Sequence, residues 1–378
     1  MNLKLNGDNG TIGNVNWGFF FYQGAHDVTM CNLDMDGFDI AVHSASTTNN
    51  KIKLTGSQIT NSRTMGYLGT GSNIEISYNY WDGNGSSNVF DHTIYLSSGT
   101  DTQLLGNYIH GQYGSTCLGA PIVGHGKFTN LIVANNEVVV ETAADTGGCW
   151  AIAFDNGGYS TPTYVRNARF SGNIVRNGGN TSLEVANCPD CIIENNLLIL
   201  NSAYSSIGIS VPNSPARTSP ADDVSTRNLV RNNTVWFGPN ANGGAVGIKV
   251  GTEGTGHVVA NNTVYYSAAS AGNGVSCYSY NLPLTSYAYI NNNHCYSAAT
   301  YSWVATRGLL AAWQTYATAA GFDTVSFTGD PQFTAVGANF IPSGGSPLIG
   351  AGNALNGSVL DILLNTRANP PAIGAYEP

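Results

Sequence analysis

The sequence predicts an all-β fold, a right-handed parallel β-helix, from a regular repeat and from the periodicity within each repeat. An asparagine recurs at a fixed position, with an apolar residue three places before it and another two places after it. The repeat asparagines are Asn79, Asn107, Asn136, Asn173, Asn196, Asn233, Asn262 and Asn293. A repeat of about 20–50 residues that keeps its core register while its loops vary in length is typical of a solenoid.

The segments around these asparagines alternate with a period of two, as in residues 130–140, which indicates strands. No unit has helical periodicity long enough for a leucine-rich or ankyrin-type repeat. Strands of successive units would therefore stack in parallel about 4.8 Å apart, in a solenoid of about ten coils. We expect the asparagine column at a bend, where the amide tolerates αL geometry and bonds the next coil. Ser57 and Cys31 extend this column upstream.

Each unit also contains a second short strand, whose outward residues form columns across the coils. One predicted column contains Ala41, Tyr95, Val123, Ala153, Glu184, Ser210 and Lys249. The column two residues further on contains His43, Ser97, His125, Asp155, Ala186, Pro212 and Gly251. This alignment places His125 and Asp155 on adjacent coils, with Tyr95 one coil before them and Glu184 one coil after.

The composition suits a rigid extracellular scaffold and excludes some classes of partner. Only 10% of the 378 residues are charged, against roughly 25% in typical soluble domains. The formal charge of −9 argues against nucleic acid and anionic membranes as partners. It argues only weakly against an acidic polysaccharide, because local basic residues or a bound Ca²⁺ could reverse the sign. Asp222 and Asp223 are candidate Ca²⁺ ligands, although further spaced oxygen ligands are missing and no metal site is predicted.

The chain has 7 cysteines, and their positions favour pairing. Two pairs fall at similar places in neighbouring coils or within one coil, and a third lies in a tight Cys-Pro-Asp-Cys segment. The pairs are Cys117 with Cys149, Cys277 with Cys295, and Cys188 with Cys191, which leaves Cys31 unpaired. This arrangement would imply secretion. The alternative is that the thiols are reduced and simply buried in the core.

The pattern changes after about residue 300. Residues 309–317 predict a short amphipathic helix that ends before Gly321. Glycine- and proline-rich segments follow at 329–333, 345–352 and 371–377. We therefore expect a parallel β-helix at 1–300 and a C-terminal capping segment at 301–378, packed on the last coils and covering their open strand edges.

This closing segment resembles the one on many secreted bacterial right-handed parallel β-helix proteins of the pectate-lyase-like superfamily. It also resembles the ends of several polysaccharide lyases. The resemblance implies a secreted or cell-surface protein but does not specify a substrate. No leader or transmembrane run is visible, because Met1 opens directly on strand-like sequence. A β-helix needs its first coil covered, so we expect the natural chain to have a leader and a cap upstream.

The patch of Tyr95, His125, Asp155 and Glu184 is the predicted catalytic site. In β-elimination, His125 oriented by Asp155 would act as the base and Tyr95 as the acid. Arg176 is the nearest candidate to neutralise a uronate carboxylate. In hydrolysis, Asp155 and Glu184 would be the carboxylate pair. Both roles compete with ordinary surface roles for these residues, and Asp155 could simply cap a turn.

A further outward column offers candidate substrate-binding residues. Its members are Asp82, His110, Val139, Arg176, Ile199, Trp236, Tyr265 and Tyr296. His110 and Arg176 are polar candidates, and Trp236 and Tyr265 could stack on sugar rings. The aromatic end of the column could equally be a patch that a loop covers. His92 is expected to point inward or lie at a corner, as a buried histidine with its hydrogen bonds satisfied.

The sequence therefore favours a secreted enzyme that cleaves a polysaccharide, with a lyase ahead of a glycoside hydrolase. The clustered Asp ligands and catalytic Arg of pectate lyases are not recognisable. The rival hypothesis is a non-catalytic adhesin, glycan-binding module or structural β-helix protein. An enzyme should have a groove walled by the long insertions in units 136–173 and 196–233, whereas a structural rod should have flat faces.

Overall fold

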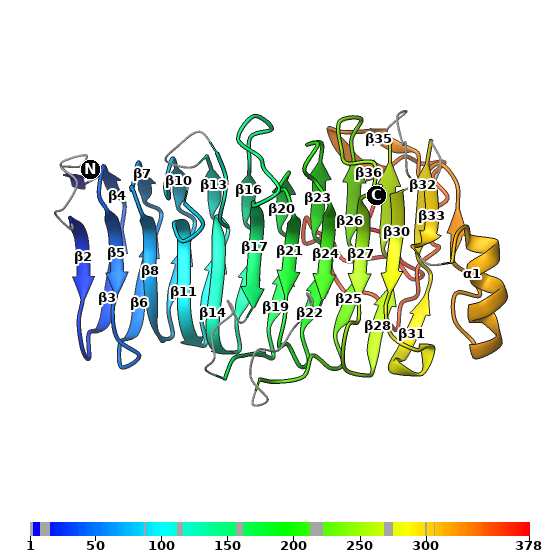
Figure 1. The fold of residues 1–378 in the computed structure, drawn as a ribbon, viewed down its shortest axis with the longest axis horizontal. Helices are drawn as coiled ribbons and strands as arrows, with labels where there is room; N and C mark the ends of the chain where they lie inside the picture. Colours follow the sequence, from blue (N-terminus) through cyan, green and yellow to red (C-terminus); the bar gives the residue numbers. More distant parts are fainter. Residues whose placement is uncertain are drawn as a thin grey trace.

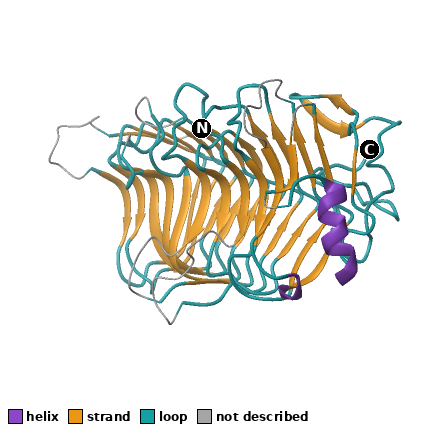
Figure 2. Ribbon diagram, turned by 45° about the vertical axis from the view of Figure 1, so that its right-hand side comes forward, coloured by secondary structure: helices purple, strands orange, loops and turns teal. Residues whose placement is uncertain are grey.

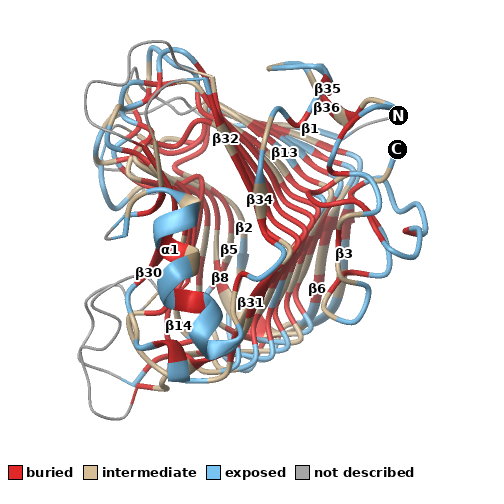
Figure 3. Ribbon diagram, turned by 90° about the vertical axis from the view of Figure 1, so that its right-hand side faces the viewer, coloured by how far each residue is buried: buried red, intermediate tan, exposed pale blue. Residues whose placement is uncertain are grey.

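The computed structural model confirms the predicted all-β parallel β-helix, in which short strands stack in long parallel sheets (Figure 1). Each complete coil contributes one strand to each of three faces, which we call A, B and C. Viewed along the axis, the three faces enclose a buried interior (Figure 3). The structure describes residues 3–7, 16–86, 88–111, 116–155, 162–211, 222–267, 275–298, 301–305 and 307–378.

Face A is a 12-stranded parallel sheet. Its strands are β1 (Leu3–Asn6), β4 (Leu33–Asp36), β7 (Gln58–Thr60), β10 (Tyr80–Asp82), β13 (Tyr108–His110), β16 (Glu137–Val139), β20 (Ile174–Arg176), β23 (Leu197–Leu200), β26 (Thr234–Phe237), β29 (Thr263–Tyr266), β32 (His294–Ser297) and β34 (Phe327–Thr328).

Faces B and C together form a 22-stranded sheet that bends at the corner between them. Face B contains β2 (Trp17–Phe21), β5 (Ile40–Ser44), β8 (Met65–Ser72), β11 (His92–Thr100), β14 (Ile122–Thr129), β17 (Trp150–Asp155), β21 (Thr181–Val185), β24 (Ile207–Val211), β27 (Val246–Val250), β30 (Val275–Tyr280) and β33 (Tyr301–Val304). Face C contains β3 (His26–Cys31), β6 (Asn50–Thr55), β9 (Glu75–Ser77), β12 (Gln103–Leu105), β15 (Ile132–Ala134), β19 (Arg169–Ser171), β22 (Ile192–Glu194), β25 (Leu229–Arg231), β28 (His257–Ala260) and β31 (Tyr287–Asn291), and β18 (Tyr164–Arg166) lies at the corner.

The repeat asparagines form a buried hydrogen-bonded ladder between faces C and A. From Asn79 to Asn262, each side-chain Nδ2 donates to the Oδ1 of the ladder asparagine on the next coil, at 2.9–3.1 Å. Each ladder Nδ2, including that of Asn293, also donates to a backbone carbonyl of the preceding coil at 2.9–3.0 Å. The bonding of each coil to the next is therefore as predicted.

Two details of the predicted ladder are wrong. The residue with αL geometry is not the ladder asparagine but the residue before it, such as Asn135 (φ 56°) or Gly172 (φ 67°). The upstream member is Leu33 rather than Cys31, since the amide of Leu33 donates to the Ser57 hydroxyl at 3.1 Å. Cys31 pairs with Thr55, two residues before the ladder position.

The first predicted column on face B is also misaligned at its upstream end. His43 pairs with Leu68, and Leu68 pairs with Tyr95, so His43 and not Ala41 precedes Tyr95 in this column. The alignment missed β8, which provides Leu68. From Tyr95 onward the register is as predicted, through Val123, Ala153, Glu184, Ser210 and Lys249.

The predicted disulfides are present. They join Cys117 to Cys149, Cys188 to Cys191, and Cys277 to Cys295, and Cys31 is free. Disulfides are typical of proteins in oxidising, extracellular environments. Among the described residues, no helix has both the length and the apolar character needed to cross a lipid bilayer.

The predicted helix forms as α1 (Leu310–Ala317), continued by η2 (Thr318–Ala320) and ended by Gly321 in αL geometry. It lies at one end of the β-helix (Figure 2). Its Trp313 is buried against Tyr280, with ring centroids 5.3 Å apart. A short helix η1 (Leu284–Ser286) leads into β31.

After β34 the chain turns back along the β-helix and forms the antiparallel pair β35 (Phe333–Ala335) and β36 (Asn339–Pro342). It then passes the αL asparagines that precede the ladder positions, in reverse order. Asn292 bonds Ala351, Asn261 bonds Asn353, Asn232 bonds Ser358 and Asn195 bonds Leu360, at 2.8–2.9 Å. The C-terminal segment therefore covers a side of the last coils as well as their end.

Candidate active site

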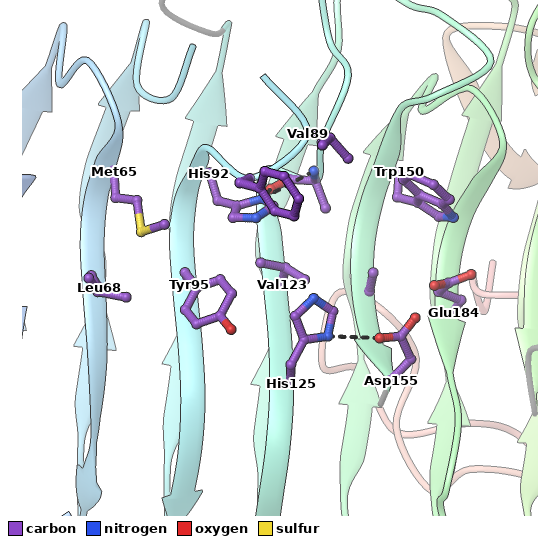
Figure 4. Close-up of a pocket in the computed structure, with 14 residues that line it drawn as sticks. Met65, Leu68, Val89, His92, Tyr95, Val123, His125, Trp150, Asp155 and Glu184 are labelled. Carbon is purple, nitrogen blue, oxygen red and sulfur yellow. Dashed lines mark hydrogen bonds and ion pairs between the residues drawn. The ribbon is translucent and has the colours of Figure 1, made fainter. Parts of the chain in front are cut away.

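A pocket of about 490 Å³ lies on the outer side of face B and contains the predicted catalytic residues (Figure 4). Strands β8, β11, β14, β17 and β21 form its floor, and loop residues form its walls. The lining residues are Met65, Leu68, Val89, Phe90, His92, Tyr95, Gly119, Ala120, Val123, His125, Trp150, Ala153, Asp155 and Glu184.

The parallel register brings the four predicted residues together from four consecutive strands. Tyr95 of β11 pairs with Val123 of β14, two residues before His125. His125 pairs with Asp155 of β17, as the sequence alignment predicted. Glu184 of β21 pairs with Ala153, two residues before Asp155. Their chemical roles stay predictions.

The Nδ1 atom of His125 lies 2.8 Å from the Oδ1 atom of Asp155 (Figure 4). The His125 side chain is 16% exposed and that of Asp155 26% exposed, so both can meet a ligand. The ring of Tyr95 contacts His125 edge-on, with centroids 5.7 Å apart. The pair is therefore held between an aromatic ring on one side and Glu184 on the other.

Glu184 is a buried carboxyl group of the pocket with a raised pKa. Its residue is only 2% exposed. Burial raises the pKa of Glu184 well above its usual value, and the charge of Asp155 and a hydrogen bond with it raise the pKa further. The Trp150 indole and the distant charge of Lys249 oppose this rise only in part. Burial and the neighbouring Asp155 therefore both favour the protonated form of Glu184 over its charged form.

His92 is part of the pocket lining and is a buried histidine, which was the expected role. Its Nδ1 is 2.9 Å from the carbonyl oxygen of Ala120. Burial lowers the pKa of His92 to about 4, so its ring is neutral near pH 7. The ring also stacks on Tyr95 at 5.5 Å between centroids, and thereby helps to fix the Tyr95 side chain.

The pocket walls come mainly from loops that the sequence analysis did not select. Val89 and Phe90 precede β11, and Gly119 and Ala120 precede β14. Trp150, at the start of β17, is a wall residue from the predicted unit 136–173. Much of the other predicted wall, at 212–221, lies outside the described residues, as does 156–161. The exposed apolar pair Val89-Phe90, inside a polar loop, was a signal that could have indicated this wall.

The second predicted column has the expected register but lies on face A, away from the pocket. Strand pairing places Asp82, His110, Val139, Arg176, Ile199, Trp236, Tyr265 and Tyr296 in one row. His110 contacts Asp82 at 3.0 Å and Glu141 at 2.9 Å. Although partial burial opposes its charge, these two carboxylates raise the pKa of His110.

The remaining predicted binding residues of this column make contacts within the chain. Arg176 pairs with Glu137 at 2.9 Å on face A, so it does not supply a cation to the pocket on face B. Trp236 and Tyr265 are only 6% and 9% exposed, because they pack against Phe333 and Phe340 of the C-terminal segment. Trp236 and Tyr265 therefore belong to a patch that another part of the chain covers, which was the alternative expectation. Their predicted role in stacking on sugar rings is not retained.

The candidate calcium ligands are occupied by contacts within the chain. Asp222 is buried and accepts a hydrogen bond from the Thr163 amide at 2.7 Å. Asp223 forms an ion pair with Arg166. In the described part of the chain, no group of three or more His, Cys, Asp or Glu residues is arranged to hold a metal ion.

Comparisons with known proteins identify no family. No family model matches the sequence, and no curated protein matches it. Among solved structures, the chain is similar to a mutant tailspike protein of the E. coli bacteriophage HK620 in complex with a pentasaccharide. The identity is 11% and the TM-score 0.42, over 80% of this chain and 69% of that chain. A likeness at this level carries no argument about function.

Proposed function

We propose that this protein is an extracellular glycoside hydrolase that cleaves its substrate in the face B pocket. The observation that carries the proposal is the buried Glu184 carboxyl group beside the more exposed Asp155, an arrangement that raises the pKa of Glu184. Two carboxyl groups whose surroundings push their protonation states apart provide an acid and a base or nucleophile at the same pH. Glycoside hydrolysis requires such a pair.

Without substrate, the Glu184 carboxyl group shares a hydrogen bond with Asp155. In the proposed reaction, the glycosidic oxygen of the substrate takes the place of Asp155 in this bond, and Glu184 donates its proton to that oxygen. Asp155 then attacks the anomeric carbon, and a covalent glycosyl–enzyme ester forms as the leaving sugar departs. The Glu184 carboxylate next removes a proton from water, and that water displaces Asp155 from the sugar. The two carboxyl groups are close enough to share a hydrogen bond, and this short separation favours a retaining course over an inverting one.

The charges around the pocket favour hydrolysis over the β-elimination that the sequence analysis preferred. Elimination next to a uronate needs a cation to neutralise the sugar carboxylate. Among the described residues that line the pocket, none is Lys or Arg. Lys249 is two strands from Glu184, or about 10 Å at the usual spacing. A uronate here would instead face the negative charge of Asp155.

A lyase is the second candidate, and the contact between Tyr95 and His125 favours it. The two rings meet edge-on on the side of His125 away from Asp155. That arrangement could provide a base and an acid on the two sides of a sugar. A binding-only protein, such as an adhesin, is the remaining alternative, because it needs the pocket but no proton transfer.

The test is incubation of the protein with neutral and acidic polysaccharides, following reducing ends and ultraviolet absorbance in parallel. We expect new reducing ends without unsaturated-uronate absorbance. Glu184→Gln and Asp155→Asn should each abolish this release while the protein stays folded. New absorbance that survives Glu184→Gln but not His125→Ala would establish a lyase instead. Silence of the folded wild type on the whole panel would contradict both enzymatic proposals.

A further inference from the structure

An exposed aromatic pair lies on the same face as the pocket, several coils upstream. Trp17 and Phe20 are the outward residues of β2, and each is 40% exposed. Their rings stack with centroids 4.3 Å apart and planes 13° apart. Tyr22, just after the strand, lies 6.1 Å from Phe20 and is also exposed. These three rings form a group of exposed aromatic side chains at one end of face B.

Strand pairing joins this aromatic pair to the pocket along two neighbouring rows. The first row runs from Trp17 through Ile40 and Met65 to His92. The second runs from Phe20 through His43 and Leu68 to Tyr95. Both rows end at residues that line the pocket. We call this strip of face B, over β2, β5, β8 and β11, the aromatic strip.

The length of the aromatic strip suits a ligand larger than one sugar. Three strand spacings separate β2 from β11, or about 14 Å. In Figure 1 the four strands lie side by side without an intervening element. A chain of a few sugars bound in the pocket and continuing along the axis would therefore reach Trp17 and Phe20.

The chemistry of the aromatic strip suits uncharged sugars. Its residues offer rings and apolar side chains, which match the apolar faces of sugar rings. His43 lies edge-on to Trp17 and Phe20, at 5.5 and 5.1 Å between centroids. Burial lowers the pKa of His43, so this ring is neutral near pH 7. On the other side of the pocket, the same row holds the polar residues Ser210 and Lys249.

The outward direction of these rings does not depend on the open edge of β2. An open edge leaves backbone N–H and C=O groups unpaired within the plane of the sheet. Outward side chains stand perpendicular to that plane, and a further strand paired to β2 would leave them on the surface.

We propose that Trp17, Phe20 and His43 form sugar-binding subsites for an uncharged glycan chain that extends from the pocket toward β2. The proposal rests on the proposed function, because it concerns the same substrate. It adds that this substrate is a polymer and that it runs from the pocket toward β2. It makes the enzyme one that prefers long chains, because only a long chain reaches both the pocket and the aromatic pair.

The test compares the wild type with a Trp17→Ala/Phe20→Ala variant by affinity electrophoresis in gels containing dextran, galactomannan or xyloglucan. The matched control is Tyr80→Ala/Tyr108→Ala, which removes another exposed, stacked ring pair, 5.6 Å between centroids, from face A. We expect at least one polysaccharide to retard the wild type. The face B variant should bind it roughly tenfold more weakly, and the control should bind it normally. Circular dichroism would check that all variants are folded.

Equal binding by the wild type and the Trp17→Ala/Phe20→Ala variant would overturn the proposal. So would an equal loss of affinity in the face A control variant, or a wild type that none of the three polysaccharides retards. Cleavage separates this result from the proposed function. Retardation that depends on Trp17 and Phe20, without cleavage, would retain the aromatic strip and reject the hydrolase. Cleavage with the same KM in the wild type and the face B variant would retain the hydrolase and reject the aromatic strip as a binding site. Oligosaccharides of two or three sugars should be cleaved equally by both proteins.

Discussion

At the scale of residues, the pocket gives two neighbouring carboxyl groups different surroundings. The pKa of Glu184 is raised because the residue is buried and because Asp155 lies beside it. Asp155 is more exposed and is paired with His125. The difference comes from their places on adjacent strands, since both are ordinary carboxylic acids in the unfolded chain.

The pH dependence of activity follows from this difference. Glu184 must be protonated to act as the acid, so activity should fall as pH rises through its raised pKa. The Lys249→Met variant removes a charge that lowers this pKa, and its alkaline limb should therefore move to higher pH. Initial rates across pH, for the wild type and this variant, would measure the shift. An alkaline limb that stays in place would argue that another group is the acid.

His125 should act as a positioning residue in the hydrolase. Its contact with Asp155 orients the carboxylate, so His125→Ala should lower kcat by about tenfold, much less than the roughly 10²-fold or greater loss for Glu184→Gln. His125→Gln, which keeps a hydrogen-bond donor, should recover part of the rate. Steady-state kinetics would decide, and complete inactivity of both His125 variants would favour the lyase mechanism.

At the scale of elements, the ladder shows how an amide side chain joins successive coils. Asn107 accepts from the Asn79 amide side chain and donates to Asn136 and to the carbonyl of Ile76. Because the ladder is buried, removing one amide leaves several partners unsatisfied. The spacing of these asparagines in the sequence was sufficient to predict this ladder.

Asn107→Ala should therefore destabilise the protein by more than a typical single hydrogen bond, or about 2–3 kcal/mol. Chemical denaturation would report this as a lower midpoint. The control is Gln58→Ala, which removes an exposed amide on β7 and should change stability by less than about 0.5 kcal/mol. Similar midpoints for the two variants would mean that the ladder adds little to stability.

At the scale of the whole molecule, a buried carboxyl group, that of Asp323, joins the C-terminal segment to the last coils of the β-helix. Asp323 bonds the Trp313 indole and the Ser326 hydroxyl, and its amide donates to the Ile290 carbonyl at 2.7 Å. Burial raises the pKa of Asp323 to about 6, from an ordinary value of 3.8. The folded protein therefore binds this proton more tightly than the unfolded chain does.

The sign of this shift predicts that Asp323 makes the protein less stable as pH rises from about 4 to about 6, with no further change above. Asp323→Asn should remove this contribution, and asparagine also tolerates the positive φ of 49° at this position. Thermal melts from pH 4 to 7 would show it as a difference between wild type and variant. A constant difference across this range would contradict the predicted titration.

The sequence by itself determined the coil architecture, the ladder and the meeting of His125 with Asp155, because a fixed strand register places equivalent positions side by side. The sequence did not predict the register where it depends on corners and loops. Ala41 was assigned to the column of Tyr95 and Cys31 to the ladder, both wrongly, and strand β8 was not predicted. Only the tertiary structure decided which outward residues are open. The C-terminal segment covers Trp236 and Tyr265, whereas Val89 and Phe90 leave a pocket over Glu184. Long-range packing decides burial, and burial sets the protonation of Glu184 and with it the chemistry that we propose.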